Sequence, residues 1–255
     1  MKRAALCLVF IGLIAFSIAH LFAQAPDQAT HAPSGDTQVT VISIFVPPLP
    51  NAPFTATVST TGVRKLDGGG TFTVQNRRTI ARDNVGRIFE ERRWLYPAGN
   101  PNENLLRQTE ISDPTAHTIY YCQPNERRCE IYAYYRRATP APLVPAGPIE
   151  EGKAFLTREI LGNDSVNGVE AVGTRETTTY NAGAFGNDQP VSLVKEFWYS
   201  PQLGVNVIEK RQDPSYGTQN FVVSDISLGE PDAKLFETPA NFQVMDMRKP
   251  SEAWR

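Results

Sequence analysis

The sequence is poor in histidine and carries almost no net charge. Only three of the 255 residues are histidines, and two of them, His20 and His31, lie near the N-terminus. Since His117 is the one histidine in the body of the chain, multi-histidine metal sites and the H-E-x-x-H zinc motif are excluded. The formal net charge of −2 argues against a nucleic-acid-binding protein, which would carry a clustered basic excess.

The motifs of common enzyme families are also missing. There is no G-x-S-x-G nucleophile elbow and no G-x-x-x-x-G-K-[ST] phosphate loop. The adjacent carboxylates Glu90 and Glu91 point to opposite faces of an expected strand, and ion pairs with Arg77 and Arg78 explain them better than catalysis. A hydrolase that uses His117 is the remaining enzymatic alternative. We therefore expect no catalytic residue, no metal site and no cofactor, and we favour a non-enzymatic protein.

The N-terminus has the pattern of a secretory signal peptide. Met1-Lys2-Arg3 precedes an uncharged, almost wholly apolar run over residues 4–19, and small residues follow. The run is shorter than the roughly 20 apolar residues that span a membrane as a helix, which favours a cleaved signal over an anchor.

Cleavage is expected after Ala23, because a cut after Ala25 would place Pro26 directly behind the scissile bond. Residues 1–23 then form the signal peptide, and residues 24–36 form a polar, disordered tail. The mature protein is expected in the periplasm or outside the cell, without a transmembrane span.

Residues 37–248 alternate apolar and polar side chains with a period of two, which is typical of half-buried antiparallel strands. We expect a mainly β fold: a curved antiparallel sheet or half-open barrel with few short helices, in one domain with a Pro-rich loop at 138–148. Two small sandwiches joined by that loop are the alternative. The expected strands cover residues 38–46, 53–65, 70–82, 86–96, 104–112, 117–122, 129–137, 153–161, 168–180, 192–200, 205–212 and 220–228.

Two segments have a helical alternative or character. Residues 148–161 are read as a loop and a strand, but Glu150 and Glu151 would also suit the first turn of a helix. Residues 231–236 have the pattern of a single helical turn that begins with proline.

Two cysteines remain once the signal peptide has taken Cys7 away. Cys122 and Cys129 end and begin neighbouring strands, so they can pair across an antiparallel hairpin in an oxidising compartment. Tyr120 would then face Ile131. A disulfide that closes a loop this short is expected to stabilise the fold by roughly 2–3 kcal/mol. A redox role is disfavoured because the spacing is not C-x-x-C.

Aromatic residues are concentrated on the expected strands and occupy both faces of the 117–136 hairpin. Most will pack in the core or across strands. An exposed group of them on a secreted β protein would mark a binding site. We take Trp94, Tyr132, Tyr134 and Trp198 as candidate ligand-binding residues.

The C-terminal half resembles a known family over residues 153–245. Glu196 to Pro201 forms a Trp-x-x-Pro-like strand end, Asn167 to Arg175 reads Asn-Gly-Val-Glu-Ala-x-Gly-Thr-Arg, and Pro231 to Pro239 closes the segment. These runs resemble the outer-membrane lipoprotein carrier (LolA-like) superfamily, which includes the regulator RseB, and a group of uncharacterised secreted bacterial proteins.

The resemblance implies a curved, half-open barrel whose concave face holds acyl chains or a protein segment. The N-terminal helix of the carriers is not evident and the Pro-rich loop is extra, so lipoprotein transport is not carried over. The sequence thus predicts an exported binding protein for an apolar or lipid ligand or an envelope protein. A structural or assembly component of the cell envelope is the alternative.

Overall fold

A computed structural model describes residues 44–134 and 143–249 of the chain. The expected signal peptide (residues 1–23) and polar tail (residues 24–36) lie outside the described residues. Residues 138–142 of the expected Pro-rich loop also lie outside the described residues, whereas residues 143–148 are described. Within the described residues, no helix is long and apolar enough to cross a membrane.

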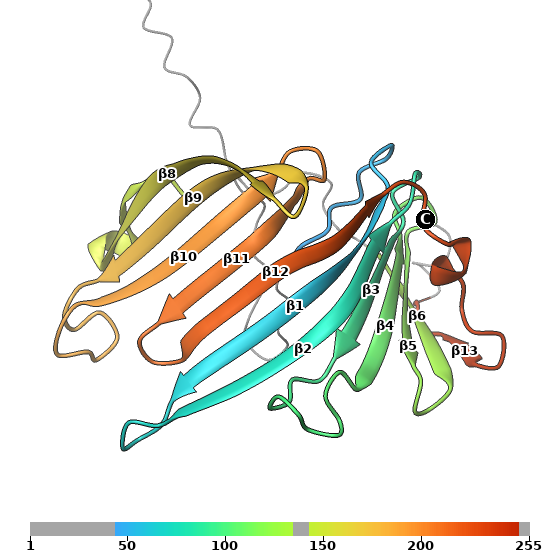
Figure 1. Cartoon of the computed structure of the whole chain (residues 1–255), viewed down its shortest axis with the longest axis horizontal. Helices are drawn as coiled ribbons and strands as arrows, with labels where there is room; N and C mark the ends of the chain where they lie inside the picture. Colours follow the sequence, from blue (N-terminus) through green and yellow to red (C-terminus); the bar gives the residue numbers. More distant parts are fainter. Residues whose placement is uncertain (1–43, 135–142, 250–255) are drawn as a thin grey trace, which may run out of the picture.

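The described chain forms a single 13-stranded sheet (Figure 1). Its order is β13-β6-β5-β4-β3-β2-β1-β12-β11-β10-β9-β8-β7. The strands are β1 (Phe54–Lys65), β2 (Thr71–Arg82), β3 (Ile88–Arg93), β4 (Leu106–Asp113), β5 (Thr118–Gln123), β6 (Arg128–Ala133), β7 (Gly147–Ile149), β8 (Ala154–Val166), β9 (Val169–Tyr180), β10 (Val191–Ser200), β11 (Val205–Asp213), β12 (Gly217–Leu228) and β13 (Gln243–Asp246). Two short 3₁₀ helices, η1 (Glu150–Gly152) and η2 (Ala233–Phe236), accompany the strands.

The expected fold class is confirmed, because the sheet is curved, antiparallel almost throughout and not closed (Figure 1). Strands β1–β6 form one half and β7–β12 the other, and β1 pairs with β12 at the junction. The one parallel pair among the described strands is β13 with β6. Short connections produce this arrangement, since consecutive strands in a hairpin must run antiparallel.

The main core lies on one face of the sheet, here called the inner face. On β1 the side chains of Phe54, Ala56 and Val58 are buried on this face, while the intervening threonines are only partly buried, as the alternation predicts. The cluster draws on both halves of the sheet: Ile44, Val46, Phe54, Ala56, Val58, Ile80, Ile88, Val169, Ala171, Leu203, Val205, Val207, Phe221 and Val223.

The fully buried Arg82 ties two loops onto the inner face. Its guanidinium donates to the carbonyl oxygens of Ala52 (2.8 Å), Pro47 (3.0 Å) and Leu203 (2.7 Å), and it lies 5.0 Å from the Phe54 ring centre. The expected strand at 38–46 is wrong in its described part: residues 44–46 are not a strand. The segment covers the sheet with Ile44 and Val46 instead of joining it.

A smaller cluster lies on the opposite, outer face. Ala81, Phe89 and Ile111 pack there beneath Phe236 of η2. This turn lies within the expected 231–236, but it begins at Ala233 and not at Pro231. The aspartate before this turn, Asp232, accepts a hydrogen bond from the backbone of Lys234 and so caps it.

Three local features differ from the sequence reading or resolve it. The helical alternative for 148–161 is excluded, because only the turn η1 precedes a 13-residue strand, β8. The described end of the Pro-rich segment contributes Gly147 and Pro148 to β7, where proline is tolerated because the strand is at the edge. β13 was not expected from the sequence, since its four residues show no buried side chain.

Candidate functional site

Directly opposed residues of antiparallel strands share a face, and this rule traces a continuous polar line along the inner face. Ile80 is opposite Glu90, Glu90 is opposite Glu110, Glu110 is opposite Tyr121, and Tyr121 is opposite Glu130. Because Ile80 belongs to the inner core, the rest of this series lies on the same face. We call the following residues of β2–β6 the inner strip: Arg78, Glu90, Arg92, Glu110, Tyr121, Glu130 and Tyr132.

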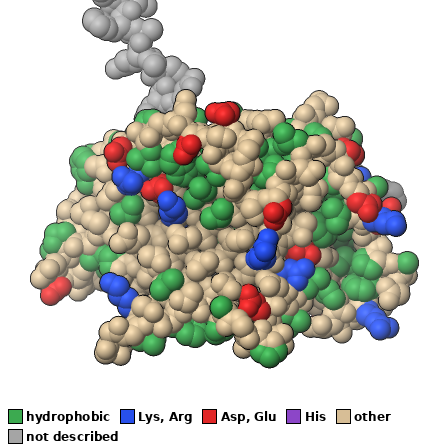
Figure 2. Space-filling model, viewed as in Figure 1, with side chains coloured by type: hydrophobic (Ala, Val, Ile, Leu, Met, Phe, Trp, Pro, Cys, Tyr) green, Lys and Arg blue, Asp and Glu red, His purple; other side chains and the backbone are tan. Residues whose placement is uncertain are grey.

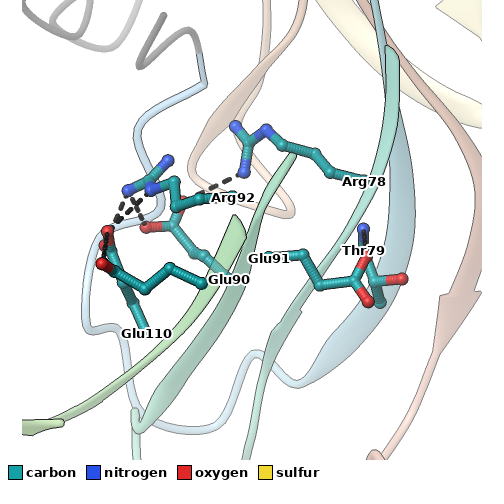
Figure 3. Close-up of polar contacts among 7 residues, drawn as sticks. Arg78, Thr79, Glu90, Glu91, Arg92 and Glu110 are labelled. Carbon is teal, nitrogen blue, oxygen red and sulfur yellow. Dashed lines mark hydrogen bonds and ion pairs between the residues drawn. The ribbon is translucent and has the colours of Figure 1, made fainter. Parts of the chain in front are cut away.

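The end of the inner strip nearest the core is a buried ion cluster (Figure 3). Arg92 bridges two carboxylates, with Nη2 3.0 Å from Glu90 Oε2 and 2.8 Å from Glu110 Oε2, and its Nε donates to Glu110 Oε1 at 2.8 Å. Arg78 Nη1 lies 3.6 Å from Glu90 Oε1 on the other side. Each carboxylate is therefore paired with arginine, an arrangement unlike that of a free general base.

Burial and charge act in opposite directions on these two arginines. Burial lowers the pKa of Arg78 to about 10, and Glu90 only partly compensates. Burial also disfavours the charged form of Arg92, but the Glu90 and Glu110 carboxylates together raise the pKa of Arg92. Both guanidinium groups therefore stay charged at neutral pH.

Buried polar atoms at the cluster include Arg92 Nη1, a donor, and Asn76 Oδ1, an acceptor, neither of which makes a hydrogen bond to any described residue. Asn76 is opposite Thr60 of β1, so it lies on the inner face as well. Both atoms are shielded from solvent, so they are unused hydrogen-bonding groups of the interior and not part of the accessible surface.

The opposite end of the inner strip is more accessible and carries aromatic rings. Tyr121 and Tyr132 meet edge to face with ring centres 5.7 Å apart. The Tyr132 hydroxyl donates to Glu130 at 3.0 Å, and Arg128 pairs with the same carboxylate at 3.1 Å. This hydrogen bond raises the pKa of Tyr132. Tyr132 is 37% exposed. Exposure thus increases along the inner strip from the buried ion cluster to the aromatic end.

The four aromatic residues proposed from the sequence are dispersed over the sheet. Tyr132 belongs to the inner strip, and the nearly buried Tyr134 follows it at the end of β6, where its amide bonds to the His117 carbonyl. Trp94 follows β3 and stacks with Arg107, whose guanidinium lies 4.8 Å from the ring centre. Trp198 lies on β10 in the other half, and its indole donates to Glu196 at 3.1 Å.

The expected hairpin around the two cysteines is confirmed. Cys122 and Cys129 are directly opposed, with Cα atoms 4.0 Å apart, and form a disulfide. Tyr120 faces Ile131 as predicted. His117 is exposed in the turn before β5 with a left-handed φ of 52°. No group of three or more His, Cys, Asp or Glu side chains suited to a metal ion occurs within the described ranges.

The expectation for Glu90 and Glu91 is confirmed for the first and refined for the second. Glu90 pairs with Arg78 across strands, whereas Glu91 pairs with Arg93 of its own strand and accepts the Thr79 amide at 2.8 Å. The sequence reading missed Arg92 and Glu110 as members of one cluster. The available signal was the Glu-Glu-Arg-Arg run in a strand whose neighbours also carry charge at inner-face positions.

No family model and no curated protein matches the chain. Among solved structures it is similar to an uncharacterized conserved protein from Thermus thermophilus (10% identity, TM-score 0.39, covering 77% of this chain and 91% of that one). It is also similar to the Pseudomonas aeruginosa MucA/MucB complex (12%, 0.36, 75% and 58%) and to a LolA superfamily protein from Nitrosomonas europaea (12%, 0.28, 74% and 91%). These similarities concern the fold alone.

Proposed function

We propose that the protein is an exported, non-enzymatic binding protein that holds an extended segment of another protein against the inner strip. The observation that supports this is the strip itself, in which ionic, amide and aromatic groups of neighbouring strands share one face of an open sheet. At the accessible end of the strip, the Glu130 carboxylate would accept hydrogen bonds from backbone amides of such a segment.

A protein segment suits the strip better than an acyl chain. Covering the partly exposed Glu130 and Tyr132 with hydrocarbon would remove their polar groups from water without offering them further hydrogen bonds, which is costly. The apolar part of the inner face is already filled by the chain's own Ile44, Val46 and Leu203. A lipid ligand is therefore the competing outcome of the test.

The test uses mature protein prepared from the periplasm, without refolding. A displayed library of random decapeptides is selected on the immobilised protein, and uptake of a fluorescent fatty acid is measured on the same preparation. Selected peptides should bind the Tyr132→Ala variant at least tenfold more weakly than the unsubstituted protein, because the exposed ring at the accessible end of the inner strip is lost. Tyr216→Ala, which removes a 69% exposed ring from the β11–β12 turn, should leave binding unchanged.

Stoichiometric fatty-acid uptake without peptide selection would refute the protein-segment ligand and favour the lipid. Peptides that bind Tyr132→Ala and Tyr216→Ala equally well would refute the inner strip as the site. Export is tested separately by sequencing the N-terminus of the secreted form, which should begin at Gln24.

The distribution of charge on one face argues against a nucleic-acid partner. The face seen in Figure 2 is mostly uncharged, and its acidic and basic side chains are scattered and intermingled. A nucleic-acid-binding face would instead carry a continuous basic patch.

A further inference from the structure

We propose that the outer edge of β6 is a docking site for an extended segment of a partner protein, and that β13 occupies this edge in the resting chain until the partner replaces it. The proposal uses backbone groups of one strand edge, and Glu130 is the inner-strip residue that would lie beside the docked segment.

β13 is an edge strand with no packed side chains. It has four residues, and all four side chains are exposed. By contrast, β1 buries every second residue along its first half. Since strands gain most of their stability from side-chain packing, β13 is held largely by its backbone hydrogen bonds and should open locally at low cost.

Along β13 and the residue that follows it, only alternate residues form backbone hydrogen bonds to β6. The amide of Gln243 donates to the Arg127 carbonyl at 2.8 Å, and the amide of Met247 donates to the Ile131 carbonyl at 2.9 Å. In a parallel ladder the amide and carbonyl of every second residue point to the partner strand. Those of Met245 therefore point to β6, and those of Val244 point away from it. This difference supplies a matched pair of positions for substitution.

The tail can leave β6 without disturbing the core. Its anchor is Phe236 of η2, which is buried in the outer cluster. Most of the residues between Glu237 and Asn241 are exposed, so the connection contributes little packing. Release of β13 would uncover the backbone edge of β6, and an uncovered edge pairs readily with another extended chain.

β13 itself indicates the chemistry of the partner. The register sets Val244 beside Cys129 and Met245 beside Glu130. A replacing segment would run parallel to β6, with apolar residues at these two positions and no acidic side chain beside Glu130. Such strand addition draws affinity from main-chain hydrogen bonds and selectivity from alternate side chains.

The test uses a fluorescent peptide with the sequence of residues 241–249 and the full mature chain. Met245→Pro deletes an amide that faces β6, so β13 should detach and the peptide should bind at least tenfold more tightly than to the unsubstituted chain. Val244→Pro removes an amide that faces away from β6, as edge strands tolerate, and should leave binding unchanged. A photo-crosslinker at the Val244 position of the peptide should label β6.

Hydrogen exchange on the unsubstituted chain gives an independent readout. The amide hydrogens of Gln243, Met245 and Met247 should exchange at least a hundredfold faster than those of the buried residues of β1. Exchange as slow as that of β1 would overturn the proposal. A folded Met245→Pro variant that binds no peptide would also overturn the proposal, even if this variant self-associates. β13 would then only protect the edge of β6 from other chains, and the edge would not be a docking site.

Discussion

Arg82 shows at the scale of one residue how a buried charge can be stabilised without a carboxylate. Three backbone carbonyls accept from its guanidinium, each belonging to a loop that covers the inner face. Arginine suits this role because its planar fork presents several donors in fixed directions, whereas lysine presents a single ammonium. Burial lowers the pKa of Arg82 to about 10, so the group is still charged at neutral pH.

Arg82→Lys is therefore expected to lower the free energy of unfolding by about 2–4 kcal/mol, since hydrogen bonds to charged groups contribute roughly 1.5–3 kcal/mol each. Urea denaturation measures the loss. Arg77→Lys is the matched control on the same strand, because the Arg77 pair with Asp225 is exposed and should change stability by under about 0.5 kcal/mol. Equal losses in the two variants would contradict the role assigned to Arg82.

Glu209 is a fully buried carboxylate between two phenylalanines. It is opposite Phe197 on one side and Phe221 on the other, and Arg211 is its ion-pair partner. Burial raises the pKa of Glu209, and Arg211 only partly offsets this effect. The folded state thus binds the proton more tightly than the unfolded chain, so the associated stability is present at low pH and is lost as pH rises through the raised pKa.

Glu209→Gln should consequently be more stable than the unsubstituted protein at pH 7, by on the order of 1 kcal/mol, and the difference should disappear near pH 4. Urea denaturation between pH 4 and 8 measures it. Glu91→Gln should behave oppositely: burial disfavours the Glu91 carboxylate, but Arg93 and the Thr79 amide lower its pKa below the ordinary value. The same sign in both variants would contradict these assignments.

At the scale of elements, the β5–β6 hairpin and its disulfide support the edge of the sheet. Replacing Cys122 and Cys129 together by alanine should lower the free energy of unfolding by about 2–3 kcal/mol, because the bridge closes a short loop in the unfolded chain. Hydrogen exchange should accelerate in β5, β6 and β13 more than in β1. A reductant should destabilise the unsubstituted protein and leave the double variant unchanged; equal sensitivity would count against this account.

Element positions could be read from the sequence where side chains alternate between a buried and a wet face. A clear example is β1, in which the buried Phe54, Ala56 and Val58 alternate with partly buried threonines. This strand begins within one residue of its expected start. β13 gave no such signal, because none of its side chains is buried. Ile44 and Val46 gave a false strand signal: their burial has the right pattern, but they lie across the sheet.

At the scale of the whole molecule, both halves of the chain share one sheet and one core. β1 pairs with β12 over nine residue positions, and the inner cluster draws on β1–β3 as well as β9, β11 and β12. We therefore propose that residues 37–248 fold as a single cooperative unit and not as two sandwiches.

The prediction is that unfolding followed in each half coincides. Trp94 reports on the half that contains β3, and Trp198 reports on the half that contains β10. Urea transitions of Trp94→Phe and Trp198→Phe, each made together with Trp254→Phe so that one tryptophan remains, should superimpose when read by fluorescence and by far-UV circular dichroism. Two separated transitions would show that the halves fold independently.

The sequence by itself determined the β class, the disulfide hairpin and the face on which most side chains of a strand lie, because these depend on period-two alternation and on near neighbours in the chain. Tertiary structure alone decided that Arg78, Glu90, Arg92 and Glu110 form one cluster, since the register between three strands brings them together. It also decided that the proposed aromatic residues are dispersed and that β13 covers β6. Those outcomes depend on strand order and curvature, which local periodicity does not encode.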